Sequence, residues 1–118
     1  MPRSDSLGQF EQLVLTAVVT LGDNAYGVTI HKKVLDLASS KVLTLGAIYV
    51  ALDRLEEKGF VSSWLSQPTA ARGGRAKRHY RPEAAGERAL RESLATARRM
   101  AASVTPIWGS SERGIAKA

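Results

Sequence analysis

The sequence predicts a mostly α-helical fold with one small β-hairpin, an α+β class in which helices dominate. Apolar residues recur at helical spacing in four segments of the chain. Between the third and fourth of these segments, a short β-prone stretch is followed by paired glycines and a second short stretch. The 118 residues, with 44% hydrophobic content, suffice for one small domain and one appended element.

The first two helices are predicted from their boundaries and their apolar residues. The first begins after Ser6, because Ser6 and Gln9 have capping-box spacing, and it ends at Gly22. Its apolar residues lie on more than one side, which is typical of a helix that is central or shared with a partner. The second helix follows residues 23–25 and ends at residues 39–40. Its apolar stripe consists of Tyr26, Ile30, Val34 and Leu37.

A third helix is predicted over residues 44–58, with Thr44 as its N-cap. Its inward face consists of Leu45, Ile48, Leu52 and Leu55. After Gly59 the pattern changes to a strand over residues 60–65 and a basic segment, residues 66–81, whose end returns as a second strand. The second and third helices then form a helix-turn-helix and the hairpin forms a wing, so we assign residues 1–82 to a winged helix-turn-helix domain.

A long fourth helix is predicted over residues 83–105, because Glu83 favours a helix start and Pro106 ends the helix at the latest. Its apolar residues have heptad spacing, which favours a homodimer contact shared with the first helix over a helix that folds back on its own domain. The predicted dimerisation residues are Leu90, Leu94, Ala97, Ala101 and Val104. Residues 106–118 are expected to form a short flexible tail. Within it, Trp108 either lines a ligand pocket between subunits or fills a hydrophobic gap, and the sequence leaves both open.

Positive charge is concentrated in one segment of the chain. Between Glu57 and Glu83 there are six Lys or Arg residues and no acid, which equals the net charge of +6 of the whole chain. Such a local excess favours a polyanion, and above all double-stranded DNA, as the partner. A solvated loop, or a module that binds an acidic protein, would have the same composition. The candidate DNA-binding residues of the wing are Arg72, Gly73, Gly74, Arg75, Lys77 and Arg78.

The outward side of the third helix carries residues suited to a DNA groove, although a solvated helix face would look similar. Gly46 and Ala47 are small enough for close approach to bases. Tyr49 can donate to a phosphate, and Val50 can contact a thymine methyl group. The candidate DNA-binding residues here are Thr44, Gly46, Ala47, Tyr49, Val50 and Arg54.

Other classes of protein are disfavoured by the composition. The chain has no cysteine, which excludes disulfides and thiolate metal sites. We see no signal-peptide pattern and no membrane-length apolar run, so a cytoplasmic protein without a membrane partner is expected. Neither His31 nor His79 has a carboxylate or second histidine at ligand spacing, and both are expected to be exposed. No catalytic residue, metal site or cofactor is predicted.

With these motifs in order, the chain resembles the PadR family of transcriptional regulators. The resemblance is carried by residues 7–11, 21–28, 46–59 and 72–75 together with Tyr80. It implies a winged-helix domain, a two-fold dimer through the fourth and first helices, and repression of nearby genes. It also implies that Tyr49, Arg75 and Lys77 face DNA. Parts of the family hold a small-molecule effector between subunits. A two-fold dimer predicts a roughly palindromic operator with half-sites about one helical turn apart.

Overall fold

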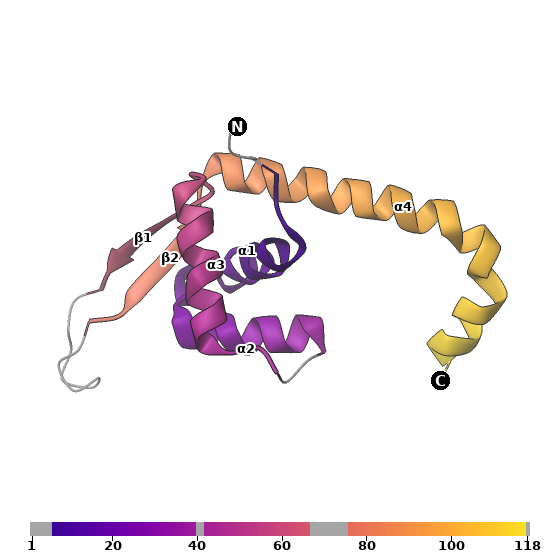
Figure 1. Cartoon of the computed structure of the whole chain (residues 1–118), viewed down its shortest axis with the longest axis horizontal. Coiled ribbons are helices and arrows are strands. Elements are labelled where there is room, and N and C mark those ends of the chain that lie inside the picture. The colour runs from indigo at the N-terminus through magenta and orange to yellow at the C-terminus, as the bar shows by residue number, and fades with distance from the viewer. Residues whose placement is uncertain (1–5, 40–41, 67–75, 118) are drawn as a thin grey trace.

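The computed structural model describes residues 6–39, 42–66 and 76–117, with side chains as far as residue 109. The elements in chain order are α1 (Gln9–Leu21), the 3-10 turn η1 (Gly22–Asn24), α2 (Gly27–Ala38), α3 (Leu45–Glu57), β1 (Val61–Leu65), β2 (Arg78–Pro82) and α4 (Ala84–Lys117). This order confirms the predicted fold class. In Figure 1, α1, α2, α3 and the hairpin form one body, from which α4 projects.

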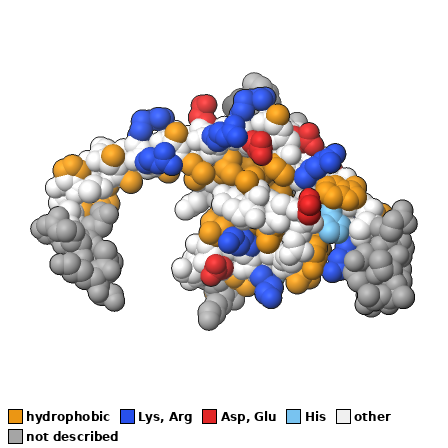
Figure 2. Space-filling model, turned by 180° about the vertical axis from the view of Figure 1, so that it is seen from behind, with side chains coloured by type: hydrophobic (Ala, Val, Ile, Leu, Met, Phe, Trp, Pro, Cys, Tyr) orange, Lys and Arg blue, Asp and Glu red, His pale blue; other side chains and the backbone are white. Residues whose placement is uncertain are grey.

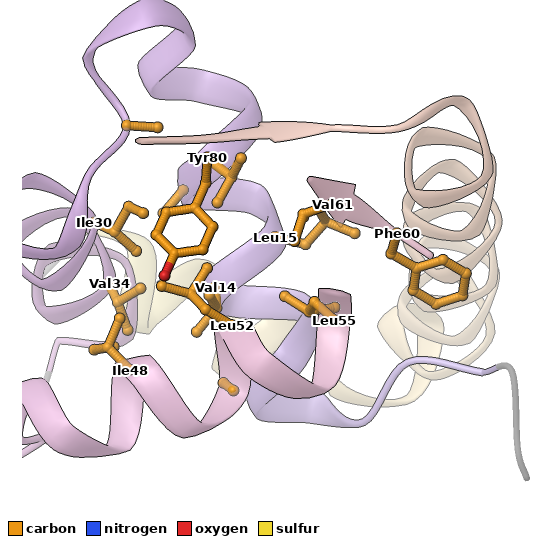
Figure 3. Packing of buried hydrophobic residues seen from close by; sticks show 14 of the residues in the cluster. Val14, Leu15, Ile30, Val34, Ile48, Leu52, Leu55, Phe60, Val61 and Tyr80 are labelled. Carbon is orange, nitrogen blue, oxygen red and sulfur yellow. The ribbon is translucent and has the colours of Figure 1, made fainter. Parts of the chain in front are cut away.

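Helix α1 lies at the centre of this body and contacts α2, α3, α4 and β2. This central place explains why α1 is apolar on more than one side. Figure 3 shows the core, in which the Tyr80 ring from β2 lies among side chains of all three helices. Its largest fully buried members are Tyr80, Leu15, Ile30, Ile48, Leu52, Leu55, Val14, Val18 and Val34.

Two of the three predicted caps are confirmed. Gly22 ends α1 with a φ of 58°, and the Thr44 hydroxyl accepts the Ala47 N–H at 3.1 Å at the start of α3. The predicted start of α1 is wrong, because the helix begins at Gln9 with Gly8 as its N-cap. The Gly8 N–H donates to Glu11 Oε1 at 2.8 Å, so a glutamate takes the role that the sequence assigned to Ser6 and Gln9.

The hairpin is antiparallel, with Ser63 opposite Tyr80 and Trp64 opposite His79. The β2 strand is attached to the start of α2, since the Tyr80 N–H donates to the Ala25 carbonyl at 2.9 Å. Tyr80 is 2% exposed, and burial raises the pKa of its hydroxyl to about 12. The wing is therefore anchored to the helical domain at its base, by both a backbone hydrogen bond and a core side chain.

Helix α4 does not end where the sequence predicts. We predicted an end by Pro106, with residues 106–118 as a tail, but the helix continues through Pro106 to Lys117. Proline lacks an N–H and crowds the carbonyl four residues earlier, which can bend a helix without ending it. Figure 1 shows α4 bent in its last third. In the turn before this proline, the Thr105 hydroxyl donates to the Ala101 carbonyl at 2.6 Å.

Candidate nucleic-acid interface

The outward face of α3 is open to solvent, as the sequence predicts. Tyr49 and Val50 are 40% and 52% exposed, Gly46 and Arg54 are also exposed, and Ala47 is half-buried. The opposite side of the helix holds the core residues, because the apolar positions recur at helical spacing. This face therefore offers a hydroxyl, small side chains, an aliphatic group and a guanidinium along one side of one helix.

Arg78 on the wing is coupled to the end of α3. Its Nη1 donates to the Ser63 hydroxyl at 3.0 Å, and that hydroxyl donates to Glu56 Oε2 at 2.9 Å. The guanidinium is exposed, so it keeps hydrogen-bond donors for another ligand. Four of the six wing candidates, Arg72, Gly73, Gly74 and Arg75, lie outside the described residues.

Lys77 lies on the other face of the hairpin, where aromatic rings are stacked. Lys77 Nζ lies 3.9 Å from the centroid of the Tyr26 ring. The His79 ring meets Tyr26 edge-on at 5.5 Å between centroids and stacks on Trp64 at 5.6 Å. The Arg81 guanidinium also lies over Trp64, 5.3 Å from the centroid of its ring. These cation–π and ring contacts fix the wing against the residue that precedes α2.

The predicted exposure of both histidines is wrong. His79 is half-buried between Trp64 and Tyr26. His31 is also half-buried, and its Nε2 lies 2.7 Å from the Leu43 carbonyl oxygen. Both rings therefore connect elements of the fold. Within the part of the chain that the structure describes, no three His, Asp or Glu side chains come together as metal ligands.

Lys58, the first cation of the charged segment, forms an ion pair within the domain. Its Nζ lies 2.8 Å from Glu11 Oε1 and donates to the Ser6 carbonyl at 2.9 Å. Burial alone would raise the pKa of Glu11, but the hydrogen bonds from Lys58 and Gly8 and the charges of Lys58 and Arg54 outweigh burial and lower it. The pair ties the C-terminal end of α3 to the start of α1. Sequence reasoning missed it because its members are 47 residues apart.

The predicted dimerisation residues fall into two groups on α4. Leu90 is 6% exposed and belongs to the core of its own domain. Leu94 and Ala101 are exposed, and Ala97 and Val104 are half-buried. Trp108, near the distal end, is 58% exposed. No helix in the described ranges is long and apolar enough to cross a membrane.

Comparison with known proteins gives one family model, the transcriptional regulator PadR-like family, which matches residues 15–92. Among solved structures, the chain is similar to a PadR family transcription regulator from hypervirulent Clostridium difficile, with 24% identity and a TM-score of 0.69 over 85% of this chain and 98% of that chain. It is similar to a PadR-like transcription factor from Bacteroides fragilis, with 25% identity and a TM-score of 0.68 over 85% of this chain and 90% of that one.

A third similar structure is the ORC1 protein of Aeropyrum pernix in complex with DNA. Identity is 27% and the TM-score is 0.60, over 78% of this chain and 26% of that chain. The comparison with curated proteins gives no match.

Proposed function

Because the chain belongs to the PadR-like family of transcriptional regulators, we propose that it is a homodimeric repressor that binds a roughly palindromic operator in double-stranded DNA. The observation that carries the proposal is the open face of α3, with Tyr49 and Val50 about half exposed, beside a basic hairpin that is anchored to the same domain. In this proposal α3 enters the major groove, and the wing, residues 66–81, lies on the flanking backbone or minor groove.

The residues of α3 have separate roles in this proposal. Val50 is the candidate for apolar contact with a base edge, and Gly46 and Ala47 permit that close approach. Tyr49 and Arg54 supply a hydroxyl and a guanidinium for phosphates, and the cap residue Thr44 lies at the end that enters the groove first. Base contacts would set the sequence preference, while phosphate contacts would set the position of the domain on the duplex.

The two wing candidates that the structure describes, Arg78 and Lys77, also have separate roles in this proposal. Arg78 is exposed and is positioned beside α3 through Ser63 and Glu56, which supports a phosphate contact next to the groove that α3 occupies. Lys77 is half-buried over the Tyr26 ring, and in this position it holds the wing in place while its charge remains part of the basic surface. On the basis of the sequence alone, Arg72 and Arg75 are also proposed to contact DNA from the wing.

Dimerisation through α4 is the second part of the proposal. Figure 2 shows hydrophobic side chains gathered where α4 meets the helical domain and continuing along α4. Leu94, Met100 and Ile107 are 40%, 61% and 77% exposed in the single chain. A groove between the start of α1 and α4 adds Leu7 and Ala97 to this surface. Exposed apolar side chains along a projecting helix are costly in water, and they favour contact with a second copy of the chain.

Selection of bound duplexes from a random pool tests the function directly. The expected result is a palindromic consensus, with half-sites about one helical turn apart, bound by a dimer in sedimentation. If the dimer neutralises on the order of eight phosphates, the log–log dependence of affinity on salt should have a slope of about −7. A protein that is monomeric at micromolar concentration and binds no duplex at low salt would refute the proposal.

The wing is tested by the double variant Arg75→Ala/Lys77→Ala. It should weaken binding to all duplexes similarly and flatten the salt dependence, because it removes two positive charges from the surface proposed to face phosphates. Val50→Ala should instead change the selected consensus. If wild-type protein bound heparin and duplex DNA equally and selected no consensus, a module for acidic proteins would be the better description.

One observation favours an added sensing role. Trp108 is 58% exposed and follows Ile107 in the C-terminal half of α4. A planar ligand held between two copies of this segment would stack on the indole ring and change the relative position of the two DNA-binding domains. Quenching of Trp108 fluorescence by planar aromatic cations or phenolic compounds, absent in Trp108→Leu, is the expected result. Trp64 is present in both proteins, so its signal is the internal reference.

A further inference from the structure

The ring of Tyr49 on α3 rests on the first residue of α2. A Cβ atom built on Gly27 would lie 2.6 Å from Tyr49 Cζ and 3.2 Å from Cε1, and closer still to the hydroxyl oxygen. Gly27 is buried, whereas Tyr49 is 40% exposed. Even a methyl group at position 27 would therefore overlap the outer part of the Tyr49 ring as it now lies.

The backbone does not explain why glycine occupies this position. Among the described glycines, positive φ values occur at Gly22 and Gly59, so position 27 has a conformation that any residue adopts. Glycine is also a poor helix former. What Gly27 supplies is space, and the group that fills this space is the Tyr49 side chain.

The same short segment also receives the wing. Tyr26, the residue before Gly27, contacts Lys77 and His79 through its ring, and the Ala25 carbonyl accepts the Tyr80 N–H. The three residues 25–27 therefore contact the wing at one end and the exposed tyrosine of α3 at the other. The position of Tyr49 is fixed relative to the wing through two consecutive residues.

We propose that Gly27 is a positioning residue for operator recognition, whose missing side chain lets the end of the Tyr49 side chain pack against α2 and so sets where this exposed residue meets DNA. The inference rests on the proposed function, in which Tyr49 faces a phosphate. A side chain at position 27 would displace the end of a flexible aromatic residue and leave the backbone in place. Recognition should therefore suffer more than folding does.

Gly27→Ala tests the proposal, with Gly8→Ala as the matched control. The control adds the same methyl group at a place where a Cβ would lie 3.5 Å from Glu11 Oε1, an ordinary contact distance. The probe is the duplex consensus that the wild-type protein selects, compared with a shuffled duplex of equal composition. Loss of a contact to a charged phosphate predicts roughly tenfold weaker binding at each half-site, and so about a hundredfold for the dimer of Gly27→Ala. Gly8→Ala should bind as the wild type does.

A double-mutant cycle separates positioning from a general structural effect. Tyr49→Ala removes the group that is positioned, so Gly27→Ala should add no further loss in that background, within about twofold. In the free protein, NMR of ¹³C-labelled tyrosine should show that the Tyr49 ring signals shift in Gly27→Ala and not in Gly8→Ala. The thermal midpoint of Gly27→Ala should stay close to that of the wild type.

Three results would overturn the inference: unchanged binding by Gly27→Ala, an equal loss in the presence and absence of Tyr49, or unshifted Tyr49 signals. Failure of the proposed function is a different result, because the wild-type protein would then select no duplex. It would be seen before any variant is compared.

Discussion

Replacement of Lys58 by methionine should destabilise the protein strongly, because it leaves the Glu11 carboxylate buried without its cation. The side chains of Lys58 and Glu11 are only 13% and 10% exposed and approach to 2.8 Å. Lys58→Met also removes the donor to the Ser6 carbonyl. The carboxylate keeps the Gly8 N–H as a hydrogen-bond donor, which does not neutralise its charge.

The size of the effect follows from this burial. Breaking a buried ion pair by removing one member costs about 3–5 kcal/mol. About a tenth of each side chain still meets water, and the Arg54 charge also favours the carboxylate, so the lower end, about 3 kcal/mol, is expected at neutral pH. For a domain of this size that loss lowers the thermal midpoint by roughly 10 °C.

The pH dependence has a defined sign. The pKa of Glu11 is lowered in the folded protein from its ordinary value of 4.5. The ionised carboxylate therefore contributes fully to the free energy of unfolding at pH values above 4.5. This contribution is lost as the pH falls through the lower pKa of the folded state. Without Lys58, burial dominates and the pKa of Glu11 should rise, so Lys58→Met should lose less stability on acidification than the wild type does.

Urea unfolding of wild type, Lys58→Met and Glu11→Gln/Lys58→Met, each at neutral and acidic pH, measures these effects. The double variant should recover much of the loss, because no buried charge remains. The reasoning is refuted if Lys58→Met unfolds within about 0.5 kcal/mol of the wild type at neutral pH, the range of ordinary surface substitutions. A double variant no more stable than the single one would refute it equally.

Three further predictions concern other contacts. Because burial raises the pKa of Tyr80 to about 12 from 10.0, the unfolded state ionises first and the wild type should lose on the order of 2–3 kcal/mol across that interval. Tyr80→Phe should not show this loss in urea titrations at alkaline pH, and equal losses in both proteins would contradict the assignment. Gly86→Ala should lower the thermal midpoint sharply, since a Cβ there would lie 2.9 Å from the Phe60 carbonyl carbon, a backbone atom that cannot rotate away; an unchanged midpoint would count against this packing. Thr44→Ala should cost about 1 kcal/mol through loss of the cap, whereas Thr44→Ser should be nearly neutral, and calorimetry of the pair distinguishes cap from side-chain volume.

The elements that the sequence predicts correctly are those whose signals are local. The Thr44 cap lies three residues from the N–H it accepts, and Gly22 needs no partner to adopt its positive φ. The predicted start of α1 is wrong because the side chain that accepts the N–H of the cap residue Gly8 is Glu11, which is held in place by Lys58 from the far end of α3. A partner so distant in sequence leaves no periodic trace.

The histidines and Pro106 show the same limit. The burial of His79 results from contacts with Trp64 across the hairpin and with Tyr26, the residue before α2. No spacing along the chain reveals these contacts. Pro106 lies inside α4, although the local rule for proline predicts a helix end. Local rules state what a residue costs in a helix, and the remainder of the helix decides whether that cost ends it.

Periodicity and charge sums also have limits for the candidate site. Core and interface positions require the same apolar residues at the same spacing, so the heptad pattern grouped the buried Leu90 with the exposed Leu94. Likewise, the charge excess of the segment between Glu57 and Glu83 includes Lys58, which is paired with Glu11 inside the fold. The number of basic residues in a segment is thus an upper bound on the charges that its surface offers to DNA.

Helix α3 is held differently at its two ends, and the difference matters for function. Its C-terminal end is connected to α1 by the largely buried Lys58–Glu11 ion pair, and loss of this pair should mainly lower the stability of the protein. Nearer its N-terminal end, Tyr49 rests on Gly27 next to the residue that receives the wing, and a change there displaces an exposed side chain while the core stays closed. Stability and recognition should therefore be separable along one helix, because the groups that close the core and the groups that face the proposed duplex have different supports.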